Sequence, residues 1–396
     1  MKVIVQKFGG TSIASPGARK EVIKRIVEAK QNGFFPVVVV SALRYEGCPY
    51  STDALLSLLK EVVVNPREKD LLLSCGEIIA SVIVALNLEK IGHPARALTG
   101  AQASIITDNN FGEAKILEIN PTILWQCVNS GIIPVVAGFQ GVTYTGEITT
   151  LGRGGSDITA VALGYVMKSE KIEFYKEVPG IMTTDPKDYK DAKLLPQITY
   201  EELGEMSISG ANVLHPVAVS LAQGFNLPVF VKGTFSPYIS GTSVMSGNIP
   251  VKFTKPVTAI TKISSLTTVS ISLENRKVGD IFKAVANAGI SMDFISYYPK
   301  GLMFVVGKEA TPKIKEVLSK ENVNFSLIEH CVKVTAVGAG MRGRVGVMAR
   351  AYEALERAGV EVIYATDSHI TLAFLIPEKF LNQAITALHK EFIDKA

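Results

Sequence analysis

Two glycine-containing segments, at residues 7–12 and 152–157, hold residue types that suit the handling of phosphate. Their sequences are Lys-Phe-Gly-Gly-Thr-Ser and Gly-Arg-Gly-Gly-Ser-Asp, so each combines adjacent glycines with a cation and a hydroxyl. Adjacent glycines let backbone amides approach phosphate oxygens, and the cation offsets their charge. A third segment, Thr-Thr-Asp-Pro, lies at 183–186. Because no GxxxxGK(S/T) segment occurs, the site is not a P-loop, and the pattern predicts a kinase for a small molecule.

Length and composition indicate a globular chain with more than one domain. The 396 residues exceed one ordinary domain, so two or three are expected. Hydrophobic residues make up 47% and charged residues 20% of the chain, which excludes wholesale disorder. The net charge of +4 comes without a basic tract of the kind that binds nucleic acid or a membrane surface.

The cysteines and the N-terminal sequence indicate a cytoplasmic protein. Four cysteines lie far apart without paired spacing, so neither a disulfide framework nor a metal site is expected, and a reducing compartment fits them. The first residues read directly into a strand and not into a signal peptide. No apolar run is expected to be long enough to span a bilayer.

The first two thirds of the chain alternate between predicted strands and predicted helices. Continuous apolar runs predict strands, and 3.6-residue periodicity predicts helices. The strands are expected at 2–6, 35–40, 132–137, 172–175 and 229–231, and the helices at 18–32, 54–62, 70–88, 157–167 and 213–223. This alternation predicts an α/β domain with a largely parallel sheet.

The remaining third contains a short internal repeat. Residues 241–256 are rich in glycine, proline and serine and are interpreted as a linker. Strands are then expected at 267–273 and 302–306 around a helix at 279–288, and again at 332–337 and 371–375 around a helix at 345–358. The repeat predicts two β-α-β-β-α-β modules that pack side by side.

Five segments in this order resemble those of the aspartate kinases. They are residues 7–12, Ser41-Ala42, residues 73–77, 138–141 and 152–157, and the terminal repeat resembles tandem ACT domains. The resemblance covers essentially the whole chain. It implies an amino acid kinase-type parallel-sheet sandwich at 1–245, followed by two ferredoxin-like ACT modules at 258–330 and 331–396. Residues 41–53, 66–68 and 367–369 are most similar to the diaminopimelate-sensitive type.

The resemblance implies roles for individual residues. Lys7 would bridge the terminal phosphates of the nucleotide, Arg153 would hold the α-carboxylate of the amino acid, and Glu77 would bind its ammonium group. The implied catalytic residues are Lys7 and Asp157; the ATP-binding residues are Lys7, Phe8, Gly9, Gly10, Lys176, Glu177, Met182, Thr183, Thr184, Asp185, Pro186 and Lys187; the substrate-binding residues are Ser41, Thr52, Glu77, Arg153, Gly154, Gly155 and Ser156.

Structural explanations exist for several of these residues. Lys7 could be a surface lysine beside a tight turn, and Glu77 alone would fit a solvated helix face. Ser156 and Asp157 are also expected to cap a helix N-terminus, and Asp185 could cap a proline-containing turn.

The expected cofactor is ATP with Mg²⁺ carried on its phosphates, without a dedicated protein metal site. The five histidines show no ligand spacing, and His93, His215 and His330 are interpreted as structural. Residues 338–343 match GxGxxG, but too few residues follow for a dinucleotide-binding sheet. They are interpreted as the strand–helix turn of the second ACT module.

Several residues depart from the family pattern on the nucleotide side. Lys176 and Pro179 replace a small hydroxyl residue and an acid, and Asn212 and Val217 replace a lysine and an arginine. Either Lys176 and Lys232 supply replacement charge, or ATP binding is weakened.

The leading hypothesis is ATP-dependent phosphorylation of the β-carboxylate of L-aspartate to 4-phospho-L-aspartate, the first step toward diaminopimelate, lysine, threonine and methionine. The alternative is a weakly active kinase homologue that senses an amino acid. A glutamate kinase is disfavoured because such kinases lack the paired repeats. The resemblance also implies a homodimer with an effector (diaminopimelate, lysine or threonine) at the ACT modules near Asp293 and Asp367. An internal start near Met245, giving a separate regulatory subunit, stays open.

Overall fold

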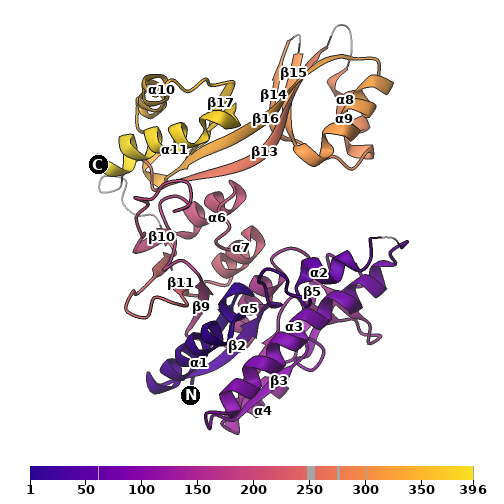
Figure 1. Cartoon of the computed structure of the whole chain (residues 1–396), viewed down its shortest axis with the longest axis vertical. Helices are drawn as coiled ribbons and strands as arrows, with labels where there is room; N and C mark the ends of the chain where they lie inside the picture. The colour runs from indigo at the N-terminus through magenta and orange to yellow at the C-terminus, as the bar shows by residue number, and fades with distance from the viewer. Residues whose placement is uncertain (61, 248–254, 274–276, 300, 396) are drawn as a thin grey trace. The chain divides into compact units, whose positions relative to one another are not determined.

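The chain divides into two compact units in a computed structural model that describes residues 1–60, 62–247, 255–273, 277–299 and 301–395 (Figure 1). The first unit comprises Met1–Met182, Lys193–Ser207 and Asn212–Asn248. The second comprises Thr183–Ala192, Ile208–Ala211 and Ile249–Ala396. Two short segments that precede residue 245 therefore group with the C-terminal part, whereas the boundaries expected from the sequence place them in the kinase domain.

The first unit is built on an eight-stranded sheet. In sheet order its strands are β10 (Gln197–Thr199), β12 (Thr242–Met245), β11 (Val229–Gly233), β9 (Lys171–Lys176), β1 (Lys2–Phe8), β2 (Phe34–Val40), β6 (Ile133–Ala137) and β3 (Ala95–Leu98). Strands β11, β9, β1, β2, β6 and β3 are mutually parallel, and β12 runs antiparallel to β11. The central strands are buried on both faces, which explains their continuous apolar sequences.

Helices cover both faces of this sheet. They are α1 (Pro16–Gln31), α2 (Thr52–Ser57), α3 (Pro66–Glu89), α4 (Thr122–Asn129), α5 (Gly155–Val166), α6 (Tyr200–Ile208) and α7 (Pro216–Gly224). On β1, Gln6 bonds to α1 through the Arg25 carbonyl and Lys7 pairs with α5 through Asp157. Since neighbouring strand residues point to opposite faces, α1 and α5 lie on opposite sides of the sheet.

A small second sheet completes the first unit. Its order is β5 (Ile116–Ile119), β4 (Ile105–Thr107), β7 (Gln140–Val142) and β8 (Ile148–Thr150). The fully buried Asp70 of α3 accepts hydrogen bonds from the Thr150 amide at 2.7 Å, the Thr150 hydroxyl at 2.8 Å and the Gly112 amide at 2.8 Å. A buried carboxylate needs such partners, and these three bonds fix α3 against the small sheet.

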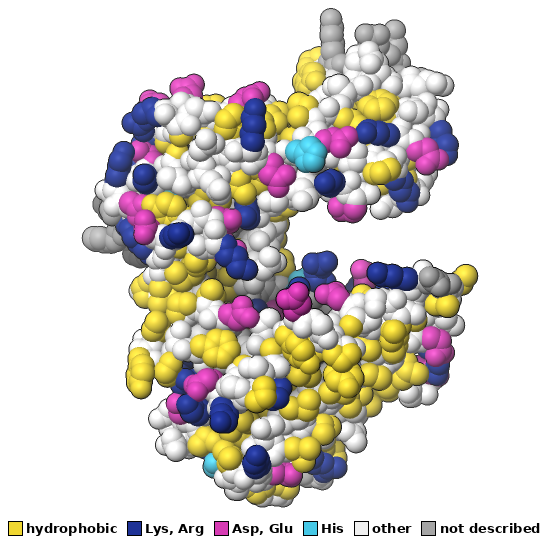
Figure 2. Space-filling view, in the orientation of Figure 1, with side chains coloured by type: hydrophobic (Ala, Val, Ile, Leu, Met, Phe, Trp, Pro, Cys, Tyr) yellow, Lys and Arg dark blue, Asp and Glu magenta, His cyan; other side chains and the backbone are white. Residues whose placement is uncertain are grey.

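Helix α3 is apolar along its whole length. By length and composition it could cross a membrane, so the expectation that no segment is long enough was wrong. Half of its apolar window is buried inside the unit, as in the core helix of a globular domain. Its outer face is apolar too, because Leu71, Val82 and Leu86 are exposed. Figure 2 shows hydrophobic side chains gathered on this part of the first unit.

The second unit contains one six-stranded antiparallel sheet shared by two modules. Its order is β14 (Asp293–Tyr298), β15 (Gly301–Gly307), β13 (Ala259–Ser272), β16 (Asn324–Val337), β18 (Thr371–Pro377) and β17 (Tyr364–Asp367). The first module adds α8 (Val278–Asn287) and α9 (Thr311–Lys320), and the second adds α10 (Val347–Arg357) and α11 (Leu381–His389). Each module has its own apolar core, one around Phe304 and one around Phe374.

The predicted repeat is confirmed, with one difference in the second module. The first module has the full β-α-β-β-α-β order from β13 to β16. The second begins with β16 and, within the described residues, has no strand after α11. The first half of β13 fills the vacant sheet position, because Ala259 pairs with Val337 and Ile263 with Lys333. Residues 338–343 form the expected turn, with a 3-10 segment at Ala339–Met341 before α10.

The predicted α/β class and parallel sheet are confirmed, but two local predictions were wrong. The linker expected at 241–256 contains β12, whose pairing with β11 and β10 makes Thr242–Met245 part of the sheet; its residues 248–254 lie outside the described part. The helix expected at 54–62 ends at Ser57, where α2 passes into a turn.

Candidate active site

Lys7 forms a buried ion pair at the carboxyl end of β1. Its ammonium lies 2.6 Å from Asp157 Oδ1 in the first turn of α5, and both side chains are only 8% exposed. Burial opposes ionisation of Asp157, but the charges of Lys7 and Lys176 and the His215 amide hold its pKa below the usual range. Lys7 is therefore a buried cation at the carboxyl end of a strand inside the parallel sheet. The explanation that it is a surface lysine is wrong.

Lys176 adds a second cation to the same face of the sheet. Lys7 pairs in register with Phe174, and strand residues two apart point to the same side, so Lys176 faces the side of Lys7 and Asp157. Burial and the neighbouring charge of Lys7 lower the pKa of Lys176 to about 8, although Asp157 acts in the opposite direction. The ammonium groups of Lys7 and Lys176 thus both interact with one carboxylate, that of Asp157.

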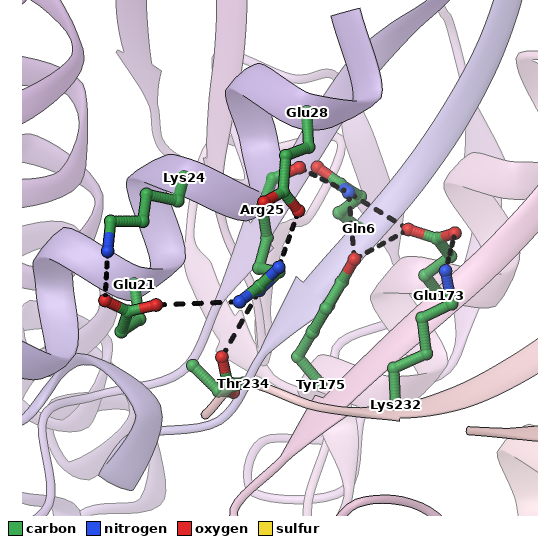
Figure 3. A network of polar contacts seen from close by, with 9 residues as sticks. All are labelled: Gln6, Glu21, Lys24, Arg25, Glu28, Glu173, Tyr175, Lys232 and Thr234. Atoms are coloured by element: carbon green, nitrogen blue, oxygen red, sulfur yellow. Dashed lines mark hydrogen bonds and ion pairs between the residues drawn. The ribbon is translucent and has the colours of Figure 1, made fainter. Parts of the chain in front are cut away.

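Lys232 belongs to a different network on the opposite face. It pairs in register with Tyr175, and its ammonium lies 2.9 Å from Glu173 Oε1 (Figure 3). Burial would raise the pKa of Glu173, but Lys232, Lys171 and Gln6 lower it to about 2. Lys232 therefore forms its ion pair with Glu173 on the side of the sheet that α1 covers. Of the two candidate replacement cations, only Lys176 lies beside Lys7.

The two glycines after β1 meet different surroundings. A Cβ on Gly10 would lie 2.1 Å from the Ala42 carbonyl oxygen, so the backbone itself excludes any side chain there. A Cβ on Gly9 would meet nothing within 4 Å. The space above Gly9 is open, which suits close approach of a ligand to the backbone.

Glu77 is a buried carboxylate with one oxygen left over. It projects from α3, is 3% exposed, and accepts a hydrogen bond at 3.0 Å from the Ala42 amide, next to Ser41. Its Oε2 has no hydrogen-bond partner among the described residues. Burial raises its pKa to about 7, while the Ala42 bond and the charge of Lys7 oppose the rise. Such an acceptor fits a cationic group of a ligand, and the solvated-face explanation is wrong for this residue.

The segment before α5 brings an exposed guanidinium to the start of a helix. Arg153 is exposed, and α5 begins at Gly155 with Gly154 as its N-cap. No side chain caps this helix, so the expectation that Ser156 and Asp157 act as caps was wrong. Both residues instead lie in the first turn of α5, where the positive end of the helix dipole favours an anion, although the Gly155 and Asp157 amides already donate to the carbonyls of Gly152 and Gly154.

Gly154 is required at its position for two reasons. Its φ of +75° is unfavourable for other residues, and a Cβ would lie 2.2 Å from Cγ of the His215 ring. We therefore expect Gly154→Ala to lower the free energy of unfolding by about 2 kcal/mol or more in chemical denaturation.

Gly146→Ala is the matched control for this substitution. Gly146 has a φ of +89°, but no atom lies within 4 Å of the added Cβ. Alanine at this position therefore introduces backbone strain without a steric clash and should lower the free energy of unfolding by about 1 kcal/mol. Equal losses in the two variants would contradict a role for the contact between Gly154 and His215.

His215 is a site residue that the sequence interpretation assigned only to structure. Its amide donates to Asp157 Oδ2 at 3.3 Å, its ring lies against Gly154, and burial together with the charge of Arg153 lowers its pKa. Asp157 opposes that shift. The available signal was the pair of His215 and Pro216 at the start of α7, which marks a helix N-terminus without revealing which residues lie near it.

The structure brings together the predicted residues around Lys7 and separates a later group. Lys7, Glu77, Asp157 and Lys176 interact electrostatically in the first unit. In the same unit lie Phe8, Gly9, Gly10, Ser41, Thr52, Arg153, Gly154, Gly155, Ser156, the exposed Glu177 and Met182; Thr183, Thr184, Asp185, Pro186 and Lys187 belong to the second unit. Asp185 accepts a bond from the Lys187 amide at 2.9 Å, as expected of a turn cap.

Comparisons with known proteins place both parts of the chain in known families. The amino acid kinase family matches residues 2–233, and an ACT domain matches residues 334–392. Aspartokinase 1 of Bacillus subtilis is 39% identical over 404 residues, covering 99% of both chains. The aspartokinase of Geobacillus stearothermophilus is 38% identical over 405 residues, covering 99% of this chain and 97% of its own.

Solved structures show the same fold at lower identity. Escherichia coli aspartokinase III in complex with aspartate and ADP superposes with a TM-score of 0.80 at 23% identity, covering 98% of this chain and 99% of that chain. The same enzyme with lysine and aspartate gives 0.76 at 24% identity, covering 99% and 100%. The sheet carries the buried Lys7–Asp157 pair, the C-terminal modules are paired, and the identity to a relative reaches 39% over the full length. The chain therefore belongs to the aspartokinase family.

Proposed function

We propose that this protein transfers the γ-phosphoryl group of ATP to the β-carboxylate of L-aspartate, giving ADP and 4-phospho-L-aspartate. The proposal is carried by one observation: Lys7 forms a buried ion pair with Asp157, and its charge also acts on Glu77, a buried carboxylate with an unpartnered oxygen. An amino acid needs an acceptor for its ammonium and a cation for its carboxylate, and phosphoryl transfer needs a fixed cation near the phosphates. The names of the relatives support the same reaction.

The recognition of aspartate follows from opposite charges. Glu77 Oε2 would accept the substrate ammonium, and the Arg153 guanidinium would bind the α-carboxylate, with the positive end of the α5 dipole behind it. Both ends of the amino acid are then held, which leaves the side-chain carboxylate to attack the γ-phosphorus in line. The further substrate-binding residues are Ser41, Thr52, Gly154, Gly155 and Ser156.

The nucleotide would lie against the glycine turn after β1. Open space above Gly9 permits close approach of phosphate oxygens, and Lys7 and Lys176 supply two positive charges. The remaining ATP-binding residues are those expected from the sequence: Phe8, Gly10, Glu177, Met182, Thr183, Thr184, Asp185, Pro186 and Lys187. These cations suit phosphate oxygens, and Mg²⁺, which would offset phosphate charge when bound, would be held by those oxygens and water.

The direct test is release of ADP by the purified protein with ATP, Mg²⁺ and L-aspartate. Turnover that depends on aspartate, and is absent with L-glutamate or without an amino acid, is the expected result. Absence of aspartate-dependent turnover from a folded protein that binds nucleotide would overturn the proposal and favour the amino-acid-sensing homologue.

Lys176 is expected to set the alkaline limit of ATP use. Its ammonium loses a proton as pH rises through about 8, so kcat/KM for ATP should fall above that pH. Lys176→Thr should raise the KM for ATP at pH 7 about tenfold or more, because a charge-assisted phosphate contact is lost, and should flatten the alkaline decline. Steady-state kinetics between pH 6.5 and 9.5 measure both effects.

Two further variants complete this test. Lys176→Arg keeps a charge that does not titrate in this range, so it should retain affinity and lose the alkaline decline. Lys232→Ala removes a cation from the opposite face and should leave the KM for ATP within about twofold of wild type. An increase with Lys232→Ala as large as with Lys176→Thr would contradict the assignment.

Regulation and assembly follow the family expectation. We infer that a homodimer binds an amino-acid effector, with diaminopimelate favoured over lysine or threonine, at the C-terminal modules. Escherichia coli aspartokinase III has been solved with lysine, which supports an effector of this chemical class. The product would enter the biosynthesis of diaminopimelate, lysine, threonine and methionine in the cytoplasm.

A further inference from the structure

Residues 183–192 belong to the second unit, although they lie in the chain before the two modules that form most of it. The Thr183 carbonyl accepts a hydrogen bond at 2.7 Å from the Ile260 amide at the start of β13. Asp188 forms an ion pair with Lys262 of the same strand. This segment includes the residues expected to bind nucleotide, so that part of the expected site belongs to the same compact unit as the two modules.

A polar cluster, buried at Thr183 and His389, fixes the segment to the second module. The Thr183 hydroxyl and His389 Nε2 lie 2.9 Å apart, and His389 Nδ1 lies 3.1 Å from Asp394 Oδ2. The Tyr189 hydroxyl donates to the same Asp394 oxygen at 2.9 Å, and the Tyr189 and His389 rings lie 4.4 Å apart between centroids. Thr183 and Tyr189 are therefore both held by one histidine–aspartate pair.

The histidine cannot move independently of the module core. His389 is fully buried at the end of α11, and Thr183 is 3% exposed. The preceding residues of α11, Ala384, Ile385 and Leu388, are fully or almost fully buried in the core around Phe374. A buried imidazole with both nitrogens bonded has one favourable orientation, because any rotation would leave a buried polar atom unpaired.

We propose that His389 is a positioning residue for nucleotide binding: through the Thr183 hydroxyl it holds residues 183–187 in the conformation that ATP requires. The inference rests on the proposed function, which assigns these residues to the nucleotide. It makes the conformation of residues 183–187, and with it their contribution to ATP affinity, depend on the second module.

Kinetics of single and double variants test the proposal. Thr183→Val removes the hydroxyl at nearly constant shape, and His389→Gln disturbs its partner. Each should raise the KM for ATP about tenfold, while the KM for aspartate changes less than twofold. The double variant should be no worse than the poorer single variant, because both act through one contact. Thr183→Ser should restore the wild-type KM.

Controls separate positioning from loss of structure. Arg357→Gln removes a surface ion pair with Glu391 in the same module and should leave both KM values unchanged. A general loss of stability would change both KM values or only the melting temperature. If His389→Gln does not fold, Tyr189→Phe, which removes the bond to Asp394, takes its place. Additive effects in the double variant, or an unchanged KM for ATP, would overturn the proposal.

Failure of the proposal and failure of the proposed function give different results. A wild-type protein without aspartate-dependent ADP release contradicts the function. Calorimetric titration with Mg-ATP then replaces the KM measurement. Hydrogen exchange of the amides of residues 184, 185 and 187–189 reports the contact itself. Those amides should exchange faster in Thr183→Val than in wild type, and equal rates would contradict the positioning role.

Discussion

Lys7→Ala is expected to lower kcat by about 10³-fold or more while the protein stays folded. The ammonium is fixed by Asp157 at 2.6 Å at the end of a buried strand, so it needs no reorganisation when charge spreads over the transferring phosphoryl group. Water in the place of the side chain would not reproduce that charge. ADP release under saturating ATP and aspartate measures the loss.

The Lys7→Ala substitution also affects Asp157, the buried partner of Lys7. Removing the ammonium leaves Asp157 with Lys176 and the His215 amide, so its pKa should rise and some stability should be lost. Lys171→Ala, which breaks the ion pair with Glu173 on the other face of the sheet, is the matched control. It should lose stability to a similar degree but keep kcat. A Lys7→Ala protein with near wild-type kcat would exclude Lys7 from catalysis.

Glu77→Gln is expected to raise the KM for aspartate about 100-fold. A neutral amide replaces a buried carboxylate oxygen that has no protein partner, and the charge-assisted bond to an ammonium is lost. The variant should keep its fold, since an amide oxygen can still accept from the Ala42 amide. Aspartate titrations at saturating ATP measure the effect.

The pH dependence provides a second measurement for Glu77. Its pKa is raised to about 7, so the carboxyl is ionised above that pH and neutral below it. Only the ionised form attracts an ammonium, and kcat/KM for aspartate should fall about tenfold per pH unit below 7. Glu77→Gln should lack this acidic decline. Glu89→Gln, an exposed change at the end of the same helix, should retain it.

Much of the first unit could be predicted because its strands are buried on both faces. Phe34–Val40 and Ile133–Ala137 are continuous apolar runs, and a sheet covered by helices on both sides requires such sequences. β12 was missed because a four-residue strand at 242–245 lies among glycines and serines. Its pairing with β11 and β10 comes from tertiary contacts that local composition does not encode.

The sequence predicted which residue types form the candidate site, but not which side chains lie next to one another in it. Lys7 and Asp157 stand in distinctive glycine segments, whereas the choice between Lys176 and Lys232 depends on strand parity and register. Both lysines occupy strand ends, but one faces Asp157 and the other faces Glu173. The attachment of residues 183–192 to His389 joins positions far apart in the chain, and no periodicity or spacing signals such a contact.

The shared strand β13 has a consequence for how the protein is made. Its second half pairs with the beginning of β16, from Ser272 with Asn324 onward, whereas its first half pairs with the end of β16, up to Ala259 with Val337. During synthesis the chain leaves the ribosome from the N-terminus, so the first module can close while Ala259–Ile263 still lacks its neighbour. Residues Ala259–Ile263 therefore remain an unpaired strand edge until Lys333–Val337 has left the ribosome. A pause in translation between the two modules would therefore prolong exposure of an unpaired strand, the kind of surface on which newly made chains associate wrongly.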